Sequence, residues 1–397
     1  MLEIILWLFV GLIFYCYLGY PVCLWLVAKV RGKEVRKRDA LLSVSVVLSV
    51  WNEEDVIAEK IRNLLSLDYP LEKMEILIAS DGSTDRTDEI VRGVPDERVR
   101  LFENSGRRGK PAALNDLLQH SRHEIIVFTD ARQSFARDAV RELVRNFADE
   151  RVGCVSGELV FAQTGGGTAK GINVYWDYEK GIRALESRIH SMLGATGAIY
   201  AIRKELFVNV PKDIVLDDMF VPLKIVEKGF RAIFDESAKA YDKAADSPRE
   251  EHSRKARTLY GNYQIFKIFS HLFNVFKSPV AIQLFSHKFL RVVIPFLLIG
   301  VFLVNLILVG RPFYDGLFVA QVVFYLMAVA GGLARHKKYG ILKFISRSCC
   351  VPYVFCLMNF SALMGFLRFV GSRQGVAWEK AREAVARDSG HKTGDKT

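Results

Sequence analysis

The sequence predicts a membrane protein in which one large α/β domain lies between apolar helices. Of its 397 residues, 50% are hydrophobic and yet 25% are charged, which indicates separate apolar and soluble blocks. Within the soluble block, short β-branched runs alternate with segments of helical spacing. That alternation is typical of a parallel sheet with helices on both faces.

The first apolar block covers residues 4–28 without a charged residue, a length that fits a bilayer core of about 30 Å. A secretory signal peptide is the alternative, but the block is too long and no basic residues precede it. We therefore expect an N-terminal transmembrane helix at residues 1–30. Because basic residues follow the block, the positive-inside rule places the soluble domain in the cytoplasm; they are Lys29, Arg31, Lys33, Arg36, Lys37 and Arg38.

The soluble domain is expected over residues 40–262. We predict strands at 41–50, 75–79, 99–102, 124–129 and 152–161, and helices at 53–67, from about 85, at 111–120 and at 137–147. Polar clusters follow three of these strands, at 52–54, 80–83 and 129–130. Ligands of such sheets bind beyond the carboxyl ends of the strands, so the clusters predict one shared binding site.

Three further apolar blocks lie at residues 292–310, 316–333 and 349–367. We expect an interfacial amphipathic helix at 263–285, a C-terminal membrane region of two to three spans at 286–370, and a polar tail at 371–397. The first two blocks predict a hairpin, because the basic residues 335–338 mark a second cytoplasmic loop. The third is either a full span, which places the basic tail outside, or a re-entrant or interfacial element. The predicted location is the cell inner (plasma) membrane, with several passes.

The basic composition does not indicate nucleic acid as a partner. The net charge is +11, but no basic motif with interleaved aromatic residues accompanies it. Attraction to anionic membrane lipid and to a phosphorylated ligand is the simpler interpretation. The six cysteines include no Cys-x-x-Cys pair, which argues against a disulfide framework or a zinc site.

Seven short motifs occur in order: SVWNE at 49–53, ASDGSTD at 79–85, GKPAALN at 109–115, FTDA at 128–131, GATGA at 194–198, LDD at 216–218 and RKAR at 254–257. Together they resemble the inverting family 2 glycosyltransferases, a group with the cellulose, hyaluronan and chitin synthases and bacterial exopolysaccharide transferases. The resemblance covers residues 44–264 and implies a GT-A fold, a mixed sheet with helices on both faces. It also implies sugar transfer with inversion from a nucleotide-sugar, by resemblance a UDP-sugar, to a lipid-linked or saccharide acceptor. The implied context is polysaccharide or glycolipid biosynthesis, with polysaccharide assembly proteins as candidate partners.

The resemblance assigns the first motifs to the donor. Asn52, Glu53 and Asp81 are expected to line the nucleotide pocket, with Asp81 on the uracil or ribose. Lys110 opens a helix after a glycine, so its ammonium and the helix N-terminus can both face phosphate. Each has a plain alternative: an Asx turn or N-cap for Asp81, first-turn helix charge for Glu53, and a solvated surface lysine for Lys110.

Asp130 is the expected ligand of a divalent cation, Mg²⁺ or Mn²⁺, because a diphosphate leaving group needs its charge neutralised. The family usually carries Asp-x-Asp, whereas this chain has Asp130-Ala131-Arg132. The missing second carboxylate puts two-carboxylate metal binding in doubt. Arg132 either replaces part of the ion's role at the phosphates or points elsewhere.

Asp218 matches the last Asp of the family's acidic pair and is the expected catalytic base, which takes the acceptor's hydroxyl proton. Asp217 beside it is expected on the acceptor side, where like-charge repulsion raises the pKa of Asp218. The alternative is an N-cap pair for the helix from Met219. Gly197 is expected to let the backbone approach the acceptor sugar closely.

Processive synthases carry Gln-x-x-Arg-Trp where this chain has Arg254, Arg257 and Thr258. The resemblance implies that Arg257 clamps the diphosphate as a catalytic residue, with Arg254 beside it on the donor. The alternative for this basic pair is the face of a membrane-surface helix. Because the Trp is missing, we favour limited transfer onto a lipid-linked or oligosaccharide acceptor over a polysaccharide threaded outward.

Two other function classes compete with an active enzyme. The substitution at Arg132 motivates a catalytically impaired nucleotide-sugar-binding partner subunit of a polysaccharide assembly complex. A sugar or lipid transporter is disfavoured, because the spans are few and lack intramembrane carboxylates and broken-helix pairs. The motifs do not name the sugar, since selectivity depends on the shape of the pocket.

Overall fold

A mixed eight-stranded sheet organises the domain in the computed structural model, which describes residues 1–161, 167–242, 248–334 and 349–371. The strand order is β3-β2-β1-β4-β7-β6-β8-β5. The strands are β1 (Val44–Val50), β2 (Met74–Ser80), β3 (Val99–Glu103), β4 (Ile125–Phe128), β5 (Ser134–Phe135), β6 (Val152–Phe161), β7 (Tyr200–Arg203) and β8 (Arg231–Asp242). All five predicted strands are present, and β5, β7 and β8 add to them.

The sheet changes direction at its centre. β1 is parallel to β2 and β4, and β2 is parallel to β3. β7 then runs antiparallel to β4 and β6, while β8 pairs parallel to β6 and antiparallel to β5. The mixed sheet is therefore confirmed, and the carboxyl ends of β1, β2 and β4 meet at one edge.

Helices cover both faces of this sheet, because successive side chains of β1 point to opposite faces and nearly all of them are buried. Val47 packs into one core cluster with residues of α5 (Lys110–His120) and α8 (Asp217–Glu227). Val46 and Leu48 face the opposite cluster, which includes residues of α3 (Ile57–Leu65) and α6 (Ala139–Arg145). α4 (Thr87–Arg92) follows β2. The predicted helices on both faces are thus confirmed.

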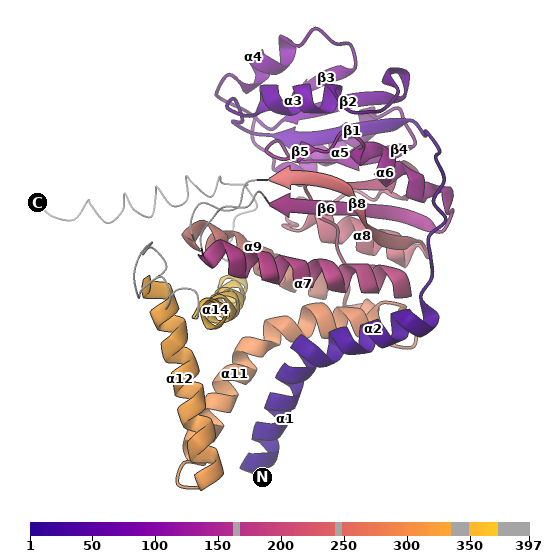
Figure 1. Cartoon of the computed structure of the whole chain (residues 1–397). Helices are drawn as coiled ribbons and strands as arrows, with labels where there is room; N and C mark the ends of the chain where they lie inside the picture. The colour runs from indigo at the N-terminus through magenta and orange to yellow at the C-terminus, as the bar shows by residue number, and fades with distance from the viewer. Residues whose placement is uncertain (162–166, 243–247, 335–348, 372–397) are drawn as a thin grey trace, which may run out of the picture.

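Two long helices lie between the sheet and the apolar helices: α7 (Gly167–Ile189) and α9 (Pro248–Ile268) (Figure 1). The predicted helix at 263–285 is not continuous. After α9 the chain forms a 3₁₀ turn (Ser270–Phe273) and the short α10 (Ala281–Gln283). The side chain of Asn274 accepts a hydrogen bond from the backbone N–H of Phe276, and Pro279 has no N–H to donate, so both residues favour a turn over a helix.

Within the described ranges, four helices are long and apolar enough to cross a membrane. The first contains α1 (Leu2–Phe14), a π-helical segment (Tyr15–Gly19) and α2 (Tyr20–Arg31). The others are α11 (Leu290–Ile307), which continues a π-helical segment (Leu284–Phe289), α12 (Pro312–Ala334) and α14 (Cys350–Val370). The basic residues 335–338 and the tail beyond residue 371 lie outside the described part of the chain.

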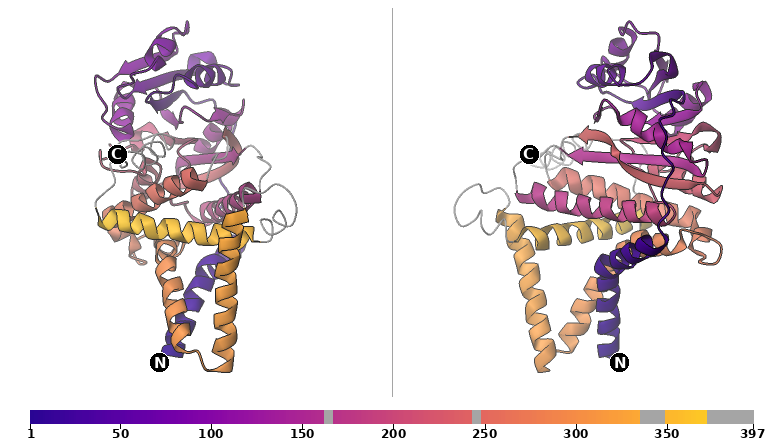
Figure 2. Two further views of the ribbon diagram at one scale, coloured as in Figure 1. Left: turned by 90° about the vertical axis from the view of Figure 1, so that its left-hand side faces the viewer. Right: turned by 45° about the vertical axis from the view of Figure 1, so that its right-hand side comes forward.

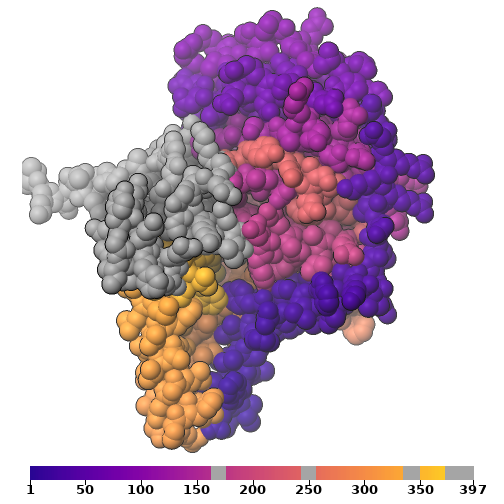
Figure 3. All heavy atoms as spheres, in the orientation of Figure 1, coloured from indigo at the N-terminus to yellow at the C-terminus, as the bar shows by residue number. Residues whose placement is uncertain are grey.

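These apolar helices do not all run in the same direction. α1, α11 and α12 extend away from the domain, whereas α14 lies across their domain-side ends (Figure 2). α2 bends away from α1 and runs along the underside of the domain (Figure 1). In the space-filling view, α12 and α1 form a stem that is narrower than the domain (Figure 3).

A buried polar network joins the membrane helices to the domain. His287 lies between Glu186 and Glu179 of α7, with N–O distances of 2.8 Å and 3.1 Å. The Tyr20 hydroxyl donates to Glu186 at 2.7 Å, and Arg291 forms an ion pair with Glu179. Buried polar groups are stable only when they have partners. The network therefore fixes α2 and α11 against α7.

Candidate functional site

A cavity of about 390 Å³ lies beside the carboxyl ends of β1, β2 and β4. Its wall combines the loops after these strands with the N-terminal ends of α5 and α8 and with the helices nearest the membrane. Eight of the residues proposed from the sequence line it: Glu53, Asp81, Lys110, Asp130, Gly197, Asp217, Asp218 and Arg257. The structure thus brings together motifs that are far apart in the chain.

Asp81 follows β2 and is 4% exposed. Its carboxylate accepts hydrogen bonds from the backbone N–H groups of Arg108 and Gly109, both at 2.8 Å. Gly82 beside it has φ 71°, and a Cβ there would lie 2.9 Å from the backbone of Gly106. Asp81 therefore holds the segment that leads into α5, in addition to lining the cavity; its contact with a nucleoside stays a prediction.

Asn52 and Glu53 are the other two residues expected in the nucleotide pocket, and only Glu53 lines the cavity. Asn52, at φ 52°, accepts a hydrogen bond from the backbone N–H of Thr84 at 2.7 Å and does not line the cavity. Glu53 is 3% exposed and lies 3.5 Å from the guanidinium of Arg132. Arg132 does not line the cavity either. In the structure Arg132 is thus paired with Glu53, which does line the cavity, and its role at the phosphates stays a prediction.

Trp51 and Arg107 form a flat surface in the cavity wall. The Arg107 guanidinium lies 3.6 Å from the centre of the Trp51 ring, and both residues line the cavity. Stacked aromatic and guanidinium groups are platforms on which a nucleobase can stack. Arg107 is not among the residues predicted from the sequence; its position in the basic run before Gly109 was the available signal.

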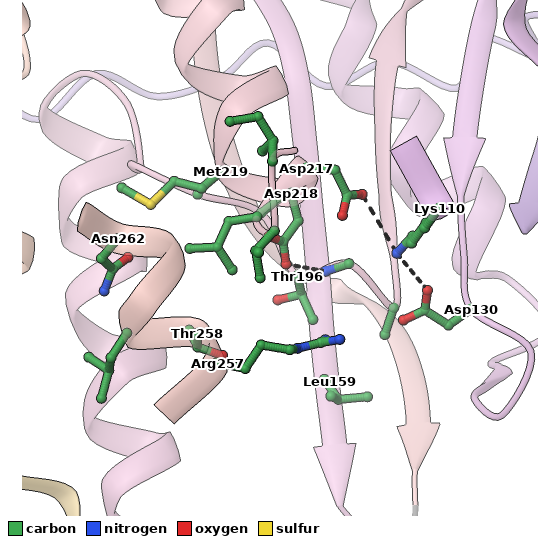
Figure 4. A pocket seen from close by; sticks show the side chains of 18 of the residues that line it. Lys110, Asp130, Leu159, Thr196, Asp217, Asp218, Met219, Arg257, Thr258 and Asn262 are labelled. Atoms are coloured by element: carbon green, nitrogen blue, oxygen red, sulfur yellow. Dashed lines mark hydrogen bonds and ion pairs between the residues drawn. The ribbon is translucent and has the colours of Figure 1, made fainter. Parts of the chain in front are cut away.

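Lys110 is the cationic centre of the site (Figure 4). Its ammonium lies 2.8 Å from Asp130 and 3.6 Å from Asp217. Burial alone would lower the pKa of Lys110, but the carboxylates of Asp130 and Asp217 outweigh it and raise the pKa above its ordinary value. Lys110 therefore stays charged, and the solvated-surface alternative does not describe it.

Asp218 lies at the start of α8 against the motif that contains Gly197. Its carboxylate accepts a hydrogen bond from the Gly197 N–H at 3.2 Å, and its backbone carbonyl accepts one from Ala195 at 2.7 Å. Burial, followed by the charge of Asp217, raises the pKa of Asp218 to about 6, against the opposing charges of Lys110 and Arg183. A carboxylate with such a pKa is suited to accept a proton near neutral pH.

Lys60 supports the segment that carries Asp130, a role the sequence analysis did not identify. From α3, its ammonium donates to the Thr129 hydroxyl at 2.7 Å and to the Gln133 carbonyl at 2.6 Å. Burial lowers the pKa of Lys60 to about 7, although Asp130 acts in the opposite direction. Because Thr129 and Gln133 flank Asp130, Lys60 fixes the position of that carboxylate.

The side chains fit a divalent cation only if a ligand supplies part of its coordination. No group of three or more His, Cys, Asp or Glu residues suited to a metal ion occurs within the described ranges. Asp130 alone of the Asp-x-Asp pattern is present, and its side chain is 37% exposed. Mg²⁺ in phosphate-binding sites uses one or two carboxylates together with phosphate oxygens. Asp130 thus fits an ion that is shared with a diphosphate.

Arg257 of α9 points toward Thr196 and Leu159 in the cavity wall, with Thr258 and Asn262 on the same helix (Figure 4). The position of Arg257 agrees with the expected contact to a ligand in the cavity. The side chain of Arg254 lies outside the described residues, so its donor role stays a prediction.

On the side of the membrane helices, the cavity has a second charged wall that the sequence analysis missed. It consists of Glu179 and Arg183 of α7 with Lys288 of the π-helical segment before α11 and Arg291 at the start of α11. Arg183 donates to the Thr196 hydroxyl at 2.7 Å and so also contacts the motif next to Asp218. The available signal was the position of Lys288 and Arg291 directly before an apolar block, where ionisable residues usually have a function.

Comparison with known proteins agrees with this geometry. Residues 45–210 match the model of glycosyl transferase family 2. This part of the chain belongs to that family. The domain is therefore that of a transferase enzyme.

A solved structure shows that the family 2 domain has the GT-A fold. The mannosyltransferase from Pyrobaculum calidifontis, in complex with GDP-Man and Mn²⁺, superposes with a TM-score of 0.71 at 24% sequence identity. The superposition covers 94% of this chain and 100% of that one, so it includes the apolar helices as well as the domain.

Two curated relatives match part of the chain. The poly-β-1,6-N-acetyl-D-glucosamine synthase of Staphylococcus aureus (strain MSSA476) is 25% identical over 236 residues, 57% of this chain and 56% of the synthase. The β-monoglucosyldiacylglycerol synthase of Trichormus variabilis is 34% identical over 132 residues, 32% of this chain and 28% of that enzyme. The chain therefore matches little more than half the length of the first and less than a third of the second.

Proposed function

We propose that the protein is a membrane-bound glycosyltransferase that moves a sugar from a nucleotide-sugar donor to a lipid-linked or saccharide acceptor, with inversion. The proposal places the reaction at the cytoplasmic face of the cell inner membrane, in polysaccharide or glycolipid biosynthesis. It rests on the convergence of Lys110, Asp130, Asp218 and Arg257 on one cavity next to the membrane helices. The names of the two curated relatives, a polysaccharide synthase and a glycolipid synthase, support both product classes.

The donor is proposed to bind with its base on the Trp51–Arg107 surface and its diphosphate between Lys110 and Arg257. A uridine nucleotide is the first candidate, and the GDP-Man of the structural neighbour makes a guanosine nucleotide the second. A divalent cation between Asp130 and the diphosphate would offset the charge that develops on the leaving group. The Mn²⁺ in the neighbouring structure supports such an ion.

The transfer is proposed as a single displacement. The acceptor oxygen forms a bond to the anomeric carbon while the bond from that carbon to the donor's diphosphate oxygen breaks. The hydroxyl proton of the acceptor goes to Asp218, and the nucleoside diphosphate leaves with the bonding electron pair. The Gly197 N–H holds the Asp218 carboxylate in place at 3.2 Å, and Lys110 and Arg257 stabilise the charge on the departing diphosphate.

A panel of nucleotide-sugars tests this proposal. We expect purified protein with Mg²⁺ or Mn²⁺ to release the nucleoside diphosphate from one donor, and to label a component of a membrane extract with its sugar. Removal of the metal with a chelator is expected to reduce turnover. Nucleotide binding without turnover of any donor under either metal contradicts the proposal and supports the catalytically impaired partner subunit instead.

The rate is expected to depend on pH through Asp218. Its pKa is raised to about 6, and only the ionised form accepts a proton. We therefore expect kcat/KM to rise with pH, with a midpoint near 6, and to fall about tenfold per pH unit below it. Nucleotide affinity measured over the same pH range is the control. A rate that is flat between pH 5 and pH 7 while chemistry limits turnover would exclude Asp218 as the base.

A further inference from the structure

A second cavity lies among the membrane helices. Its volume is about 430 Å³, and it is bounded by α11, α12 and α14. Its wall is almost entirely apolar and aromatic, with Leu298 and Phe302 from α11, Tyr325 from α12, and Phe360 and Leu363 from α14. We call this cavity the apolar groove. Such a wall is suited to a hydrocarbon chain and offers few hydrogen-bonding partners to a sugar.

The apolar groove adjoins the cavity that holds Asp218. Asn359 of α14 lines both, and it is 7% exposed. Its amide donates to the Phe355 carbonyl at 2.9 Å and lies 3.4 Å from the Tyr17 hydroxyl. α14 lies across the domain-side ends of α11 and α12 (Figure 2). Residues of α14 line both cavities, and Asn359 is common to the two linings.

The wall that α7 and the segment leading into α11 contribute to the transferase cavity is cationic. Arg183, Lys288 and Arg291 line it together with one carboxylate, Glu179, which forms an ion pair with Arg291. Arg183 donates to the Thr196 hydroxyl at 2.7 Å, next to the Gly197 N–H that binds the Asp218 carboxylate, so this positive wall reaches the segment that holds the proposed base. Arginine and lysine at the cytoplasmic ends of membrane helices are a favourable environment for phosphate headgroups.

We infer that the acceptor is a membrane lipid with an anionic phosphate head, whose hydrocarbon chain lies in the apolar groove. The head enters the transferase cavity past Asn359, and Arg183 and Lys288 bind its phosphate close to Asp218. This inference rests on the proposed function and narrows its acceptor. It also disfavours a polysaccharide threaded through the described membrane helices, because the groove between them is apolar.

A photoactivatable probe tests the inference. The probe is a long-chain alkyl phosphate with a diazirine midway along the chain, and the same chain ending in a neutral alcohol is its control. Full-length protein in lipid nanodiscs is irradiated, and the labelled peptides are mapped by mass spectrometry. We expect the phosphate probe to label α11, α12 and α14 at the groove, and to compete with unlabelled alkyl phosphate.

Two tryptophan substitutions in α11 separate the groove from the outer surface of the same helix. Leu298→Trp fills the groove, whereas Leu303→Trp adds the same side chain at a position that is 52% exposed and outside the groove. We expect Leu298→Trp to reduce labelling about tenfold or more and Leu303→Trp to leave it unchanged. Lys288→Gln is expected to weaken binding of the phosphate probe about tenfold, with little effect on binding of the alcohol probe.

Donor binding distinguishes a failure of this inference from a failure of the proposed function. Nucleotide affinity in Leu298→Trp is expected to equal that of the wild type, which also shows that the variant is folded. The alternative outcome is labelling that is spread evenly over the lipid-facing surface and is insensitive to Leu298→Trp while donor turnover continues. That result contradicts the lipid inference and leaves the proposed transferase activity supported. Groove labelling without turnover of any donor supports the lipid site and contradicts the proposed transferase activity.

Discussion

Replacing Asp218 with Asn is expected to reduce kcat about 10³-fold, the typical contribution of a positioned general base. The amide cannot accept the acceptor's proton, but its oxygen can still accept the hydrogen bond that Gly197 donates to the carboxylate at 3.2 Å. The cavity is therefore expected to keep its shape. Nucleotide affinity, measured by calorimetry, is expected to stay within about twofold of the wild type.

Asp213→Asn is the matched control, since it removes the same charge from an exposed position shortly before α8. It is expected to keep wild-type turnover. Asp217→Asn is informative in a different way, because the charge of Asp217 is the second cause of the raised pKa of Asp218. We expect this variant to move the midpoint of the pH profile downward. Full activity in Asp218→Asn would remove the assignment of the base.

Lys110→Met is expected to lower kcat/KM by a factor of roughly 10² to 10³, because it removes a cation proposed to stabilise the leaving diphosphate. A second effect follows from the same charge. Lys110 lowers the pKa of Asp218, so its loss is expected to move the midpoint of the pH profile upward. The midpoint of the pH profile is thus expected to move upward in Lys110→Met and downward in Asp217→Asn. A simple loss of stability would not move the midpoint in opposite directions, so the pair of variants tests the electrostatic coupling to Asp218.

Lys73→Met is the control for Lys110→Met. Lys73 donates to the Leu41 carbonyl at 2.7 Å and does not line the cavity, so its loss tests removal of a partly buried lysine at another place in the domain. We expect its pH profile to match that of the wild type. An unchanged midpoint in Lys110→Met, with the protein folded by circular dichroism, would contradict the coupling between Lys110 and Asp218.

The parallel half of the sheet could be predicted from the sequence because β1, β2 and β4 are short apolar runs buried on both faces. The strands of the other half carry weaker signals. β8 alternates buried and exposed positions and contains charged residues, and β7 has only four residues. These strands are stabilised by pairing with β6 and β4, a long-range contact that local patterns do not express.

The same distinction applies to the membrane helices. Apolar length identified each block, since crossing a bilayer sets a minimum number of residues. The direction of α14 depends instead on its packing against α9, α11 and α12. The bend between α1 and α2 likewise follows contacts, because Tyr20 and Leu24 are buried against α7. Hydropathy contains no information about such partners.

By itself, the sequence determined which chemical groups are present and in what order: the Asp217–Asp218 pair with the proposed base, the cationic residues and the single Asp130 carboxylate, on an α/β domain flanked by apolar helices. Only the tertiary structure decided that Lys110 lies between Asp130 and Asp217, that Arg132 turns toward Glu53, and that α7 and α11 add a second cationic wall. The physical reason is that charge interactions depend on distance and burial. Both are set by contacts between residues far apart in the chain, which motif spacing does not record.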